Sequence, residues 1–379
     1  MEKKEARIEN IGKVVSLKKP DYVPIEHVIT PELAIEFAGF PMYDGLWDTK
    51  LMIKAIGKTI PAYDGDFVRN TFYRSPRYYT ALEAKSFVQS KSGFVQHPEV
   101  HSMEDTEYDD LIRDPATFLA GTCISRLYGV FDKEEPYRSI GLAKGMMTFN
   151  RTFGTYNTEV EKILDQNNIP VIIAATAETP FDFLADLLRS FSGISKDVRR
   201  HKEKVKEACE ALLPLMIQKA TVVPPSISKM IHIPLHMPPY LSEKIFSTLW
   251  WPTFKKMVDV LVEKGYYLYI FFEGDWTRYY DYLQELPPKH ILGRFEYADP
   301  KIIKERLGSR MSLTGFYPIM TLAHGSKEMC LDKTKELMDI LAPGGGYIFG
   351  FDKITTSVKD INIENITAVN NYVRMNGKY

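Results

Sequence analysis

Apolar residues along the chain fall into eight short runs with the length and composition of buried β-strands. The runs cover residues 22–29, 59–63, 169–175, 228–236, 266–273, 290–296, 310–316 and 346–351. Most of them are nearly continuous in apolar character, which is typical of strands buried on both faces of a parallel sheet. The pattern therefore predicts a parallel β-sheet covered by helices.

Between the later runs, apolar positions recur every three to four residues, the period of an amphipathic helix. One helical segment begins near Ser195, a second spans 242–263, and a third spans 326–341. Helices that alternate with eight strands predict an α/β protein, specifically a closed (β/α)8 TIM barrel. We expect residues 1–379 to form a single domain of this kind.

Residues 67–168 do not show this alternation. They lie between the second and third predicted strands and include the polar stretches SKSGFVQHPEV and FDKEEPYRS. We predict that this region is an insertion that carries a helical lid. It could cover the mouth of the barrel or dock a partner, and the sequence favours neither role.

Composition excludes several classes of protein. The 379 residues carry a net charge of −1 and are 26% charged, so no strong field attracts nucleic acid or an anionic membrane. The N-terminus lacks the apolar segment of a signal peptide, and no apolar run reaches the roughly 18 residues of a membrane span. We therefore expect a cytoplasmic protein with no nucleic-acid or membrane partner. Cys123, Cys209 and Cys330 form no C-x-x-C pair, so any metal would need nitrogen and oxygen ligands.

Polar residues end four of the later runs, at the face of a barrel where catalytic groups gather. Glu273 and Glu296 end neighbouring runs, and His324 follows the next one. Because adjacent strands lie about 4.8 Å apart, these side chains can converge on one ion. Two carboxylates and an imidazole suit Zn²⁺ with an open fourth position. We predict this metal site, with His236 and Asp275 as proton donors or orienting groups.

Each of these residues also has a structural interpretation. A glutamate after a strand is often a surface cap or an ion-pair partner, and Arg278 and Arg294 are near in sequence. His324 could face solvent ahead of a helix, and His236 could be a core histidine. Asp182 and several other acids near strand ends are further candidates for a general acid or a substrate contact.

Segments spread over nearly the whole chain resemble the uroporphyrinogen decarboxylase superfamily. The C-terminal part has G-x-x-x-P after the seventh run, L-x-x-G before a helix, a G-G-G-Y-I turn and a closing E-N-I-x-A helix. KPDYVPIE near the start, TPFDFL at 179–184 and the segment 241–265 are also similar to this family. The resemblance implies a TIM-type barrel.

The resemblance extends to the branch that contains corrinoid-dependent zinc methyltransferases. The R-Q-A-G-R motif by which the decarboxylases grip porphyrinogen carboxylates is absent. Where thiol methyltransferases read H-x-C-G, this chain reads Phe271-Phe-Glu-Gly274. Glu273 thus replaces a zinc-binding cysteine, which makes the site oxygen-rich. It is similar to the methyltransferase components of O-demethylases, whose zinc is held by two glutamates and a histidine.

The resemblance implies O-demethylation, in which a methyl group moves from a methoxylated, ring-bearing small molecule to the Co(I) of a corrinoid protein. Zinc would be the bound cofactor, and the corrinoid would come with the partner protein. Two alternatives stay open. One is a decarboxylase or lyase of the same superfamily, for which Lys289, Arg294 and Lys353 offer positive charge, and the other is a binding module without catalysis.

Overall fold

Parallel β-strands form the frame of the molecule. The computed structural model describes residues 2–70 and 73–379. Six strands pair in parallel in chain order: β5 (Ile173–Thr176), β6 (Met230–Leu235), β7 (Leu268–Asp275), β8 (Ile291–Tyr297), β9 (Ser312–Tyr317) and β10 (Gly350–Phe351). β1 (Glu26–Ile29) and β2 (Phe67–Asn70) form a second parallel pair. A bridge between Ile25 and Phe349 connects this pair to the β10 end of the large sheet.

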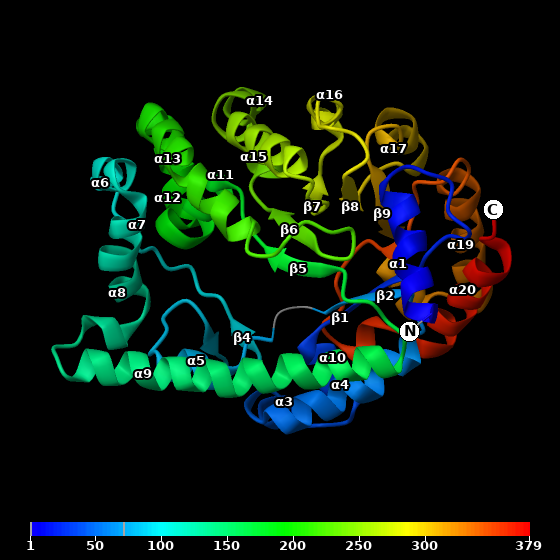
Figure 1. Cartoon of the computed structure of the whole chain (residues 1–379), viewed down its shortest axis with the longest axis horizontal. Helices are drawn as coiled ribbons and strands as arrows, with labels where there is room; N and C mark the ends of the chain where they lie inside the picture. The colour runs from blue at the N-terminus through cyan, green and yellow to red at the C-terminus, as the bar shows by residue number, and fades with distance from the viewer. Residues whose placement is uncertain (1, 71–72) are drawn as a thin grey trace.

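Side-chain contacts across the interior show that the sheet curls. The Tyr269 hydroxyl on β7 donates a hydrogen bond to the Glu26 carboxylate on β1. On the other side, Nη1 of Arg69 on β2 lies 3.0 Å from Nε2 of His232 on β6. Strands that are far apart in the pairing order therefore face each other across a common interior, as Figure 1 shows. The α/β class and the parallel sheet are confirmed, whereas full closure into an eight-stranded barrel stays a prediction.

Seven of the eight predicted strand runs overlap a parallel strand, and one prediction is wrong. Residues 59–63 end the helix α4 (Thr49–Tyr63). The buried residues of α4, which are Met52, Ala55, Ile56, Thr59, Ile60 and Tyr63, follow the helical period of three to four. The apolar run was thus one face of a helix, and the second strand is β2, four residues further along.

Helices cover the outer face of the curled sheet, and most predicted helices are confirmed. Ser242 and Ser326 cap helices that continue to Glu263 and Leu341. The predicted helix near Ser195 is instead two helices, α12 (Ser190–Arg200) and α13 (Lys202–Ala220), which break at His201. The other helices of this layer are α14 (Glu243–Ile245), α15 (Trp251–Glu263), α16 (Tyr280–Leu283), α17 (Pro300–Leu307), α18 (Ile319–His324), α19 (Lys327–Leu341) and α20 (Ile363–Asn376). No helix of the described residues is long and apolar enough to cross a membrane.

The N-terminal helix α1 (Glu2–Val15) closes the amino-terminal end of the sheet. Its Ile11, Val14 and Val15 are buried against inward-facing residues of the strands, including Met230 and Leu292. This apolar layer excludes water from one end of the interior, so that polar chemistry is confined to the other end. The short helices α2 (Pro31–Phe37) and α3 (Met42–Trp47) pack beside α4.

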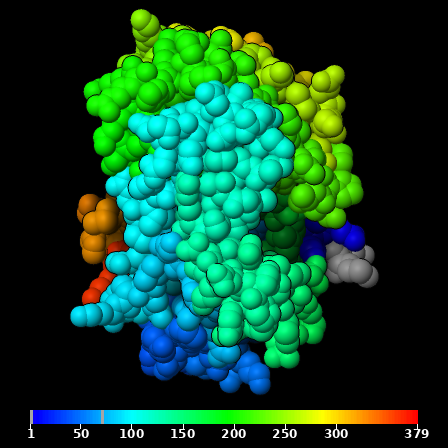
Figure 2. All heavy atoms as spheres, turned by 90° about the vertical axis from the view of Figure 1, so that its left-hand side faces the viewer, coloured from blue at the N-terminus to red at the C-terminus, as the bar shows by residue number. Residues whose placement is uncertain are grey.

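Helices dominate the region between β2 and β5. It contains α5 (Pro76–Ala81), the antiparallel pair β3 (Val88–Gln89) and β4 (Val95–Gln96), α6 (Tyr108–Arg113), α7 (Pro115–Phe118), α8 (Ile124–Leu127), α9 (Tyr137–Phe149) and α10 (Thr155–Gln166). A π-helical segment joins α9 to α10, and Figure 1 shows them as one long helix across the lower part of the molecule, above α3 and α4. In Figure 2 the cyan and teal segments of this region cover the centre of one face. The helical character is as predicted; that the region is an insertion stays a prediction.

Candidate functional site

Three polar side chains gather where adjacent strands end. His236 follows β6, Glu273 lies near the end of β7, and Glu296 lies near the end of β8. Nε2 of His236 lies 3.7 Å from a carboxylate oxygen of Glu273. Glu296 is close enough for its charge to act on Glu273. The structure thus brings together three of the five residues that the sequence singled out, and we call these three the acidic centre.

A further carboxylate holds the His236 ring. Nδ1 of His236 lies 2.8 Å from the carboxylate of Asp186, which belongs to the π-helical turn η4 (Leu184–Arg189). Burial lowers the pKa of His236, but the hydrogen bond to Asp186 and the charges of Asp186, Asp182 and Glu273 outweigh it and raise the pKa to about 9. At neutral pH the ring is therefore protonated and directs its Nε2 proton toward Glu273.

Asp182 fixes the backbone next to His236. It lies on α11 (Pro180–Phe183), is fully buried, and accepts hydrogen bonds from Met237 N at 2.9 Å and Trp250 Nε1 at 3.2 Å. The Thr179 hydroxyl, which also caps α11, donates a third bond at 2.7 Å. One carboxylate thus ties the end of β6 to α11 and to the helix that carries Trp250. Burial is the main cause that raises the pKa of Asp182, to about 6.

The backbone at Gly274 couples the two glutamates. Gly274 has a left-handed φ of 73°, and its N–H donates a 2.8 Å hydrogen bond to the Glu296 carboxylate. A Cβ at this position would lie 2.9 Å from the Pro239 ring and would meet a strained backbone as well. Lys353 lies 3.6 Å from the other Glu296 oxygen. Burial raises the pKa of Glu273; His236 opposes this shift, whereas Glu296 and Asp186 add to it.

The other two sequence candidates lie outside the acidic centre. His324 is exposed at the C-terminal end of α18 and forms no ion pair with Glu273 or Glu296 in the part of the chain that the structure describes. Asp275 is exposed and accepts a hydrogen bond from Thr277 N at 2.9 Å, which caps the turn after β7. The ligand role of His324 and the catalytic role of Asp275 stay predictions.

The sequence analysis missed Asp186, although the chain holds a signal for it. In the stretch PFDFLAD the two aspartates are four residues apart, so one helix face presents both. Asp182 was among the candidates because it lies near a strand end. The threonine cap indicates that a helix begins here. On such a helix, two aspartates four residues apart project from the same face and can contact the same neighbouring segment. Here that neighbour is the His236 segment.

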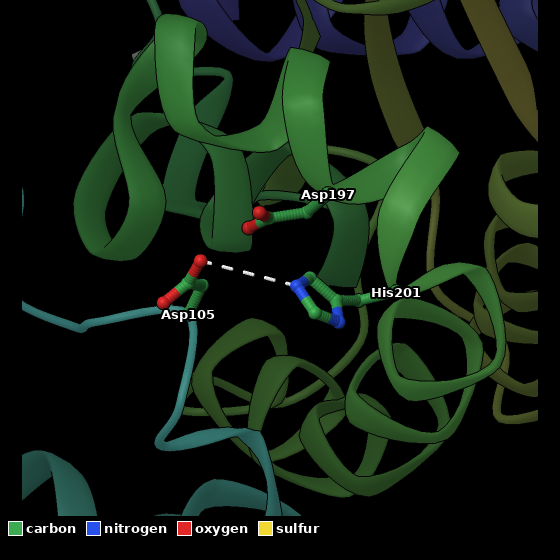
Figure 3. Close-up of side chains that lie close together, drawn as sticks. All are labelled: Asp105, Asp197 and His201. Atoms are coloured by element: carbon green, nitrogen blue, oxygen red, sulfur yellow. Dashed lines mark ion pairs between the residues drawn. The ribbon is translucent and has the colours of Figure 1, made fainter.

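A second cluster of ligand-type residues lies apart from the acidic centre. Asp105, Asp197 and His201 each place one possible ligand atom within 4.8 Å of the others (Figure 3). Among the described residues, no other group of three or more His, Cys, Asp or Glu side chains lies this close together. Asp197 is 1% exposed, and its carboxylate accepts bonds from Arg189 Nε at 2.6 Å and the Tyr108 hydroxyl at 2.8 Å. His201 lies 3.9 Å from Asp105. Because Arg189 already neutralises Asp197, the cluster is better suited to joining the helices α6 and α12 than to binding a cation. We call the buried contact of Asp197 with Arg189 and Tyr108 the latch.

Comparison with known proteins agrees with this architecture. Residues 148–375 match the family model for uroporphyrinogen decarboxylase (URO-D), and the chain belongs to that family. The structure resembles that of a methyltransferase from Methanosarcina mazei, with a TM-score of 0.64 and 14% sequence identity over 97% of this chain and 98% of that one. At this identity the likeness shows a shared fold. No curated protein matches the sequence.

The buried Asp182 predicts a specific pH dependence of stability. Its pKa of about 6 in the folded protein exceeds the value of about 3.9 in an unfolded chain, so the folded state binds the proton more tightly. The free energy of unfolding, relative to that of Asp182→Asn, should therefore fall by up to about 3 kcal/mol as the pH rises from 4 through 6. Urea unfolding at several pH values measures this difference. A difference that stays constant over the window would contradict the assignment.

The latch predicts that Asp197 contributes much more to stability than the neighbouring, exposed Asp105. Asp197→Ala leaves the buried Arg189 without its partner and should lower the free energy of unfolding by about 3–5 kcal/mol. Asp105→Ala removes an exposed contact and should change it by less than about 1 kcal/mol. Chemical denaturation of both variants checks this. Equal losses of stability in the two variants would contradict this prediction.

Proposed function

We propose that this protein is a zinc-dependent methyltransferase that moves a methyl group from a methoxylated, ring-bearing substrate to the Co(I) of a separate corrinoid protein. The observation that carries the proposal is the acidic centre, in which two glutamates and a histidine meet at the ends of adjacent strands. Membership of the URO-D family and the fold shared with a methyltransferase support it. We also infer that the eight strands complete a (β/α)8 barrel and that the helical region between β2 and β5 is an insertion, which begins after β2 because residues 67–70 form that strand.

The charges of the acidic centre fit a divalent cation. Burial is the largest cause that raises the pKa of Glu273, and the charges of Glu296 and Asp186 add to it. A cation between the two glutamates would relieve this repulsion, and carboxylate oxygens are ligands that Zn²⁺ accepts. We propose Glu273 and Glu296 as two ligands and His324 as the third. When bound, zinc would polarise the ether oxygen of the substrate.

His236 is suited to serve as the proton donor. Its pKa of about 9 keeps the ring protonated at neutral pH, and Asp186 holds Nδ1 so that Nε2 faces the open side of the centre. Departure of the methyl group leaves a negative oxygen on the substrate, and a proton from Nε2 would neutralise it. Asp275 remains a candidate for orienting the substrate at the rim.

Metal analysis of purified variants tests the ligand set. The wild-type protein should bind one zinc ion per chain, and Glu273→Gln, Glu296→Gln and His324→Ala should each lose most of it. His236→Gln should retain zinc. Glu305→Gln, an exposed glutamate on α17, is the matched control and should also retain it. Retention of zinc by both Glu273→Gln and Glu296→Gln would contradict the proposed site.

A spectroscopic assay tests the reaction. The zinc-loaded protein is mixed with a Co(I) corrinoid protein and with methoxyaromatics, methylated amines or methanol, and the appearance of methyl-Co(III) is recorded. A methoxyaromatic should give the methyl-Co(III) spectrum, and His236→Gln should slow its formation by about 10²- to 10⁴-fold while leaving zinc bound. Absence of methyl-Co(III) with all of these donors would favour the decarboxylase or lyase alternative.

A further inference from the structure

Two arginines are buried inside the curled sheet, and neither has a carboxylate partner among the residues that the structure describes. Arg69 on β2 is 7% exposed, and Arg294 on β8 is 1% exposed. Nε and Nη2 of Arg69 and Nη1 of Arg294 are buried and have no hydrogen-bond partner within residues 2–70 and 73–379. Buried charges in proteins are normally paired, because an uncompensated charge in the interior is costly. Three unused donors on two such groups therefore call for a ligand.

The bonds that the two arginines do form hold them in place. Nη1 of Arg69 lies 3.0 Å from Nε2 of His232. Burial and the charges of the two arginines hold the pKa of His232 well below its usual value, so its neutral ring can accept this hydrogen bond. Nη2 of Arg294 donates to the Phe351 carbonyl at 3.1 Å. Both guanidinium groups also lie near the ring of Phe271, at 6.0 and 5.0 Å from its centroid. Their orientation is thus fixed before any ligand arrives.

The buried carboxylate of Glu26 does not neutralise this pair. Glu26 accepts hydrogen bonds from the Tyr269 hydroxyl and from the Thr314 hydroxyl at 3.0 Å, and in the described part of the chain it forms no ion pair with either arginine. Its charge acts on Arg69 only from a distance. The two guanidinium groups and the Glu26 carboxylate together carry a charge of +1. One singly charged anion would balance it.

We propose that Arg69 and Arg294 bind the carboxylate of a monoanionic ligand inside the curled sheet, directly beneath the acidic centre. A planar carboxylate matches the fork of N–H donors on a guanidinium group, and its single charge matches the excess of +1. A phosphate dianion would overcompensate that charge. The role of this ligand as the methyl donor rests on the proposed function, whereas its binding does not.

The spacing along the strands indicates the size of the ligand. Glu296 comes two residues after Arg294 on β8, so it faces the same interior one step nearer the open end. β7 is bulged between Phe272 and Asp275, and Glu273 lies in this bulge, where the neighbouring Gly274 N–H bonds to Glu296. Two residues of a strand span about 6–7 Å. A single benzene ring with substituents at opposite ends bridges such a distance. An aromatic acid with a methoxy group opposite its carboxylate would thus place the ether oxygen at the acidic centre and the carboxylate at the arginines.

Calorimetric titration with two matched probes tests the proposal. 4-Methoxybenzoate carries the carboxylate, and 4-methoxybenzamide is its neutral counterpart of nearly equal shape. The titrations use the whole protein without a corrinoid partner, so that they measure binding and not methyl transfer. The benzoate should bind at least about tenfold more tightly than the amide, as expected for charge-assisted hydrogen bonds.

Variants of the interior give effects of opposite sign. Arg69→Gln can keep the contact with His232 but removes a charge, and it should weaken benzoate binding by about tenfold or more while changing amide binding little. Glu26→Gln raises the net charge to +2 and should strengthen benzoate binding. Arg306→Gln, a surface arginine paired with Asp281, is the matched control and should behave as the wild type.

Several outcomes separate this proposal from the proposed function. Equal affinity for benzoate and amide, or an Arg69→Gln variant that binds benzoate as the wild type does, would overturn the anion site. Weaker benzoate binding in Glu26→Gln would also contradict the charge balance. If benzoate binds selectively but the protein holds no zinc and forms no methyl-Co(III), the anion site stands and the methyltransferase proposal fails.

Discussion

The buried carboxylate of Asp182 is the interaction on which the arrangement of the functional groups depends. It joins three elements that are far apart in the sequence: the helix α11, which Thr179 caps, the segment after β6, and the helix that carries Trp250. Because Asp186 is one helical turn beyond Asp182, the same anchor sets the position of Asp186 against His236. A buried acid whose oxygens all have donors rigidifies its surroundings, so the histidine is oriented before any ligand binds.

The curled sheet separates charge along its length. At the amino-terminal end, α1 and the strands form an apolar layer. Arg69 and Arg294 follow in the interior, and Glu273, Glu296 and Asp186 surround His236 at the open end. A molecule with a negative group at one end and an ether at the other fits this order of charges. The family membership makes catalysis at this end of the strands the expected arrangement, while the side chains decide its chemistry.

Much of the fold could be predicted from the sequence because its apolar pattern is local. Continuous apolar runs located seven of the eight strands, and serine caps located two long helices. The run at 59–63 was misassigned because five residues are too few to distinguish a strand from one face of a helix. That error also hid Arg69, since the true strand lay within the supposed insertion.

The candidate site was predictable only in part, for a physical reason. Glu273, Glu296 and His236 end adjacent parallel strands, and the sheet geometry brings such residues together. His324 lies at the far end of the helix α18, whose direction the sequence does not give. Asp275 is the last residue of β7, but it follows a register shift in that strand and is exposed. Asp186 reaches the site from a helix of another βα unit, and the unpaired donors of the arginines emerge only when all neighbours are in place.

The central claim is that the two glutamates beside His236 form a metal-dependent reaction centre. Anomalous diffraction at the zinc absorption edge, from crystals of the zinc-loaded protein, tests it most directly. The account predicts a single strong peak between the Glu273 and Glu296 carboxylates. A peak confined to the cluster of Asp105, Asp197 and His201, or no ordered zinc at the ends of β7 and β8, would contradict it.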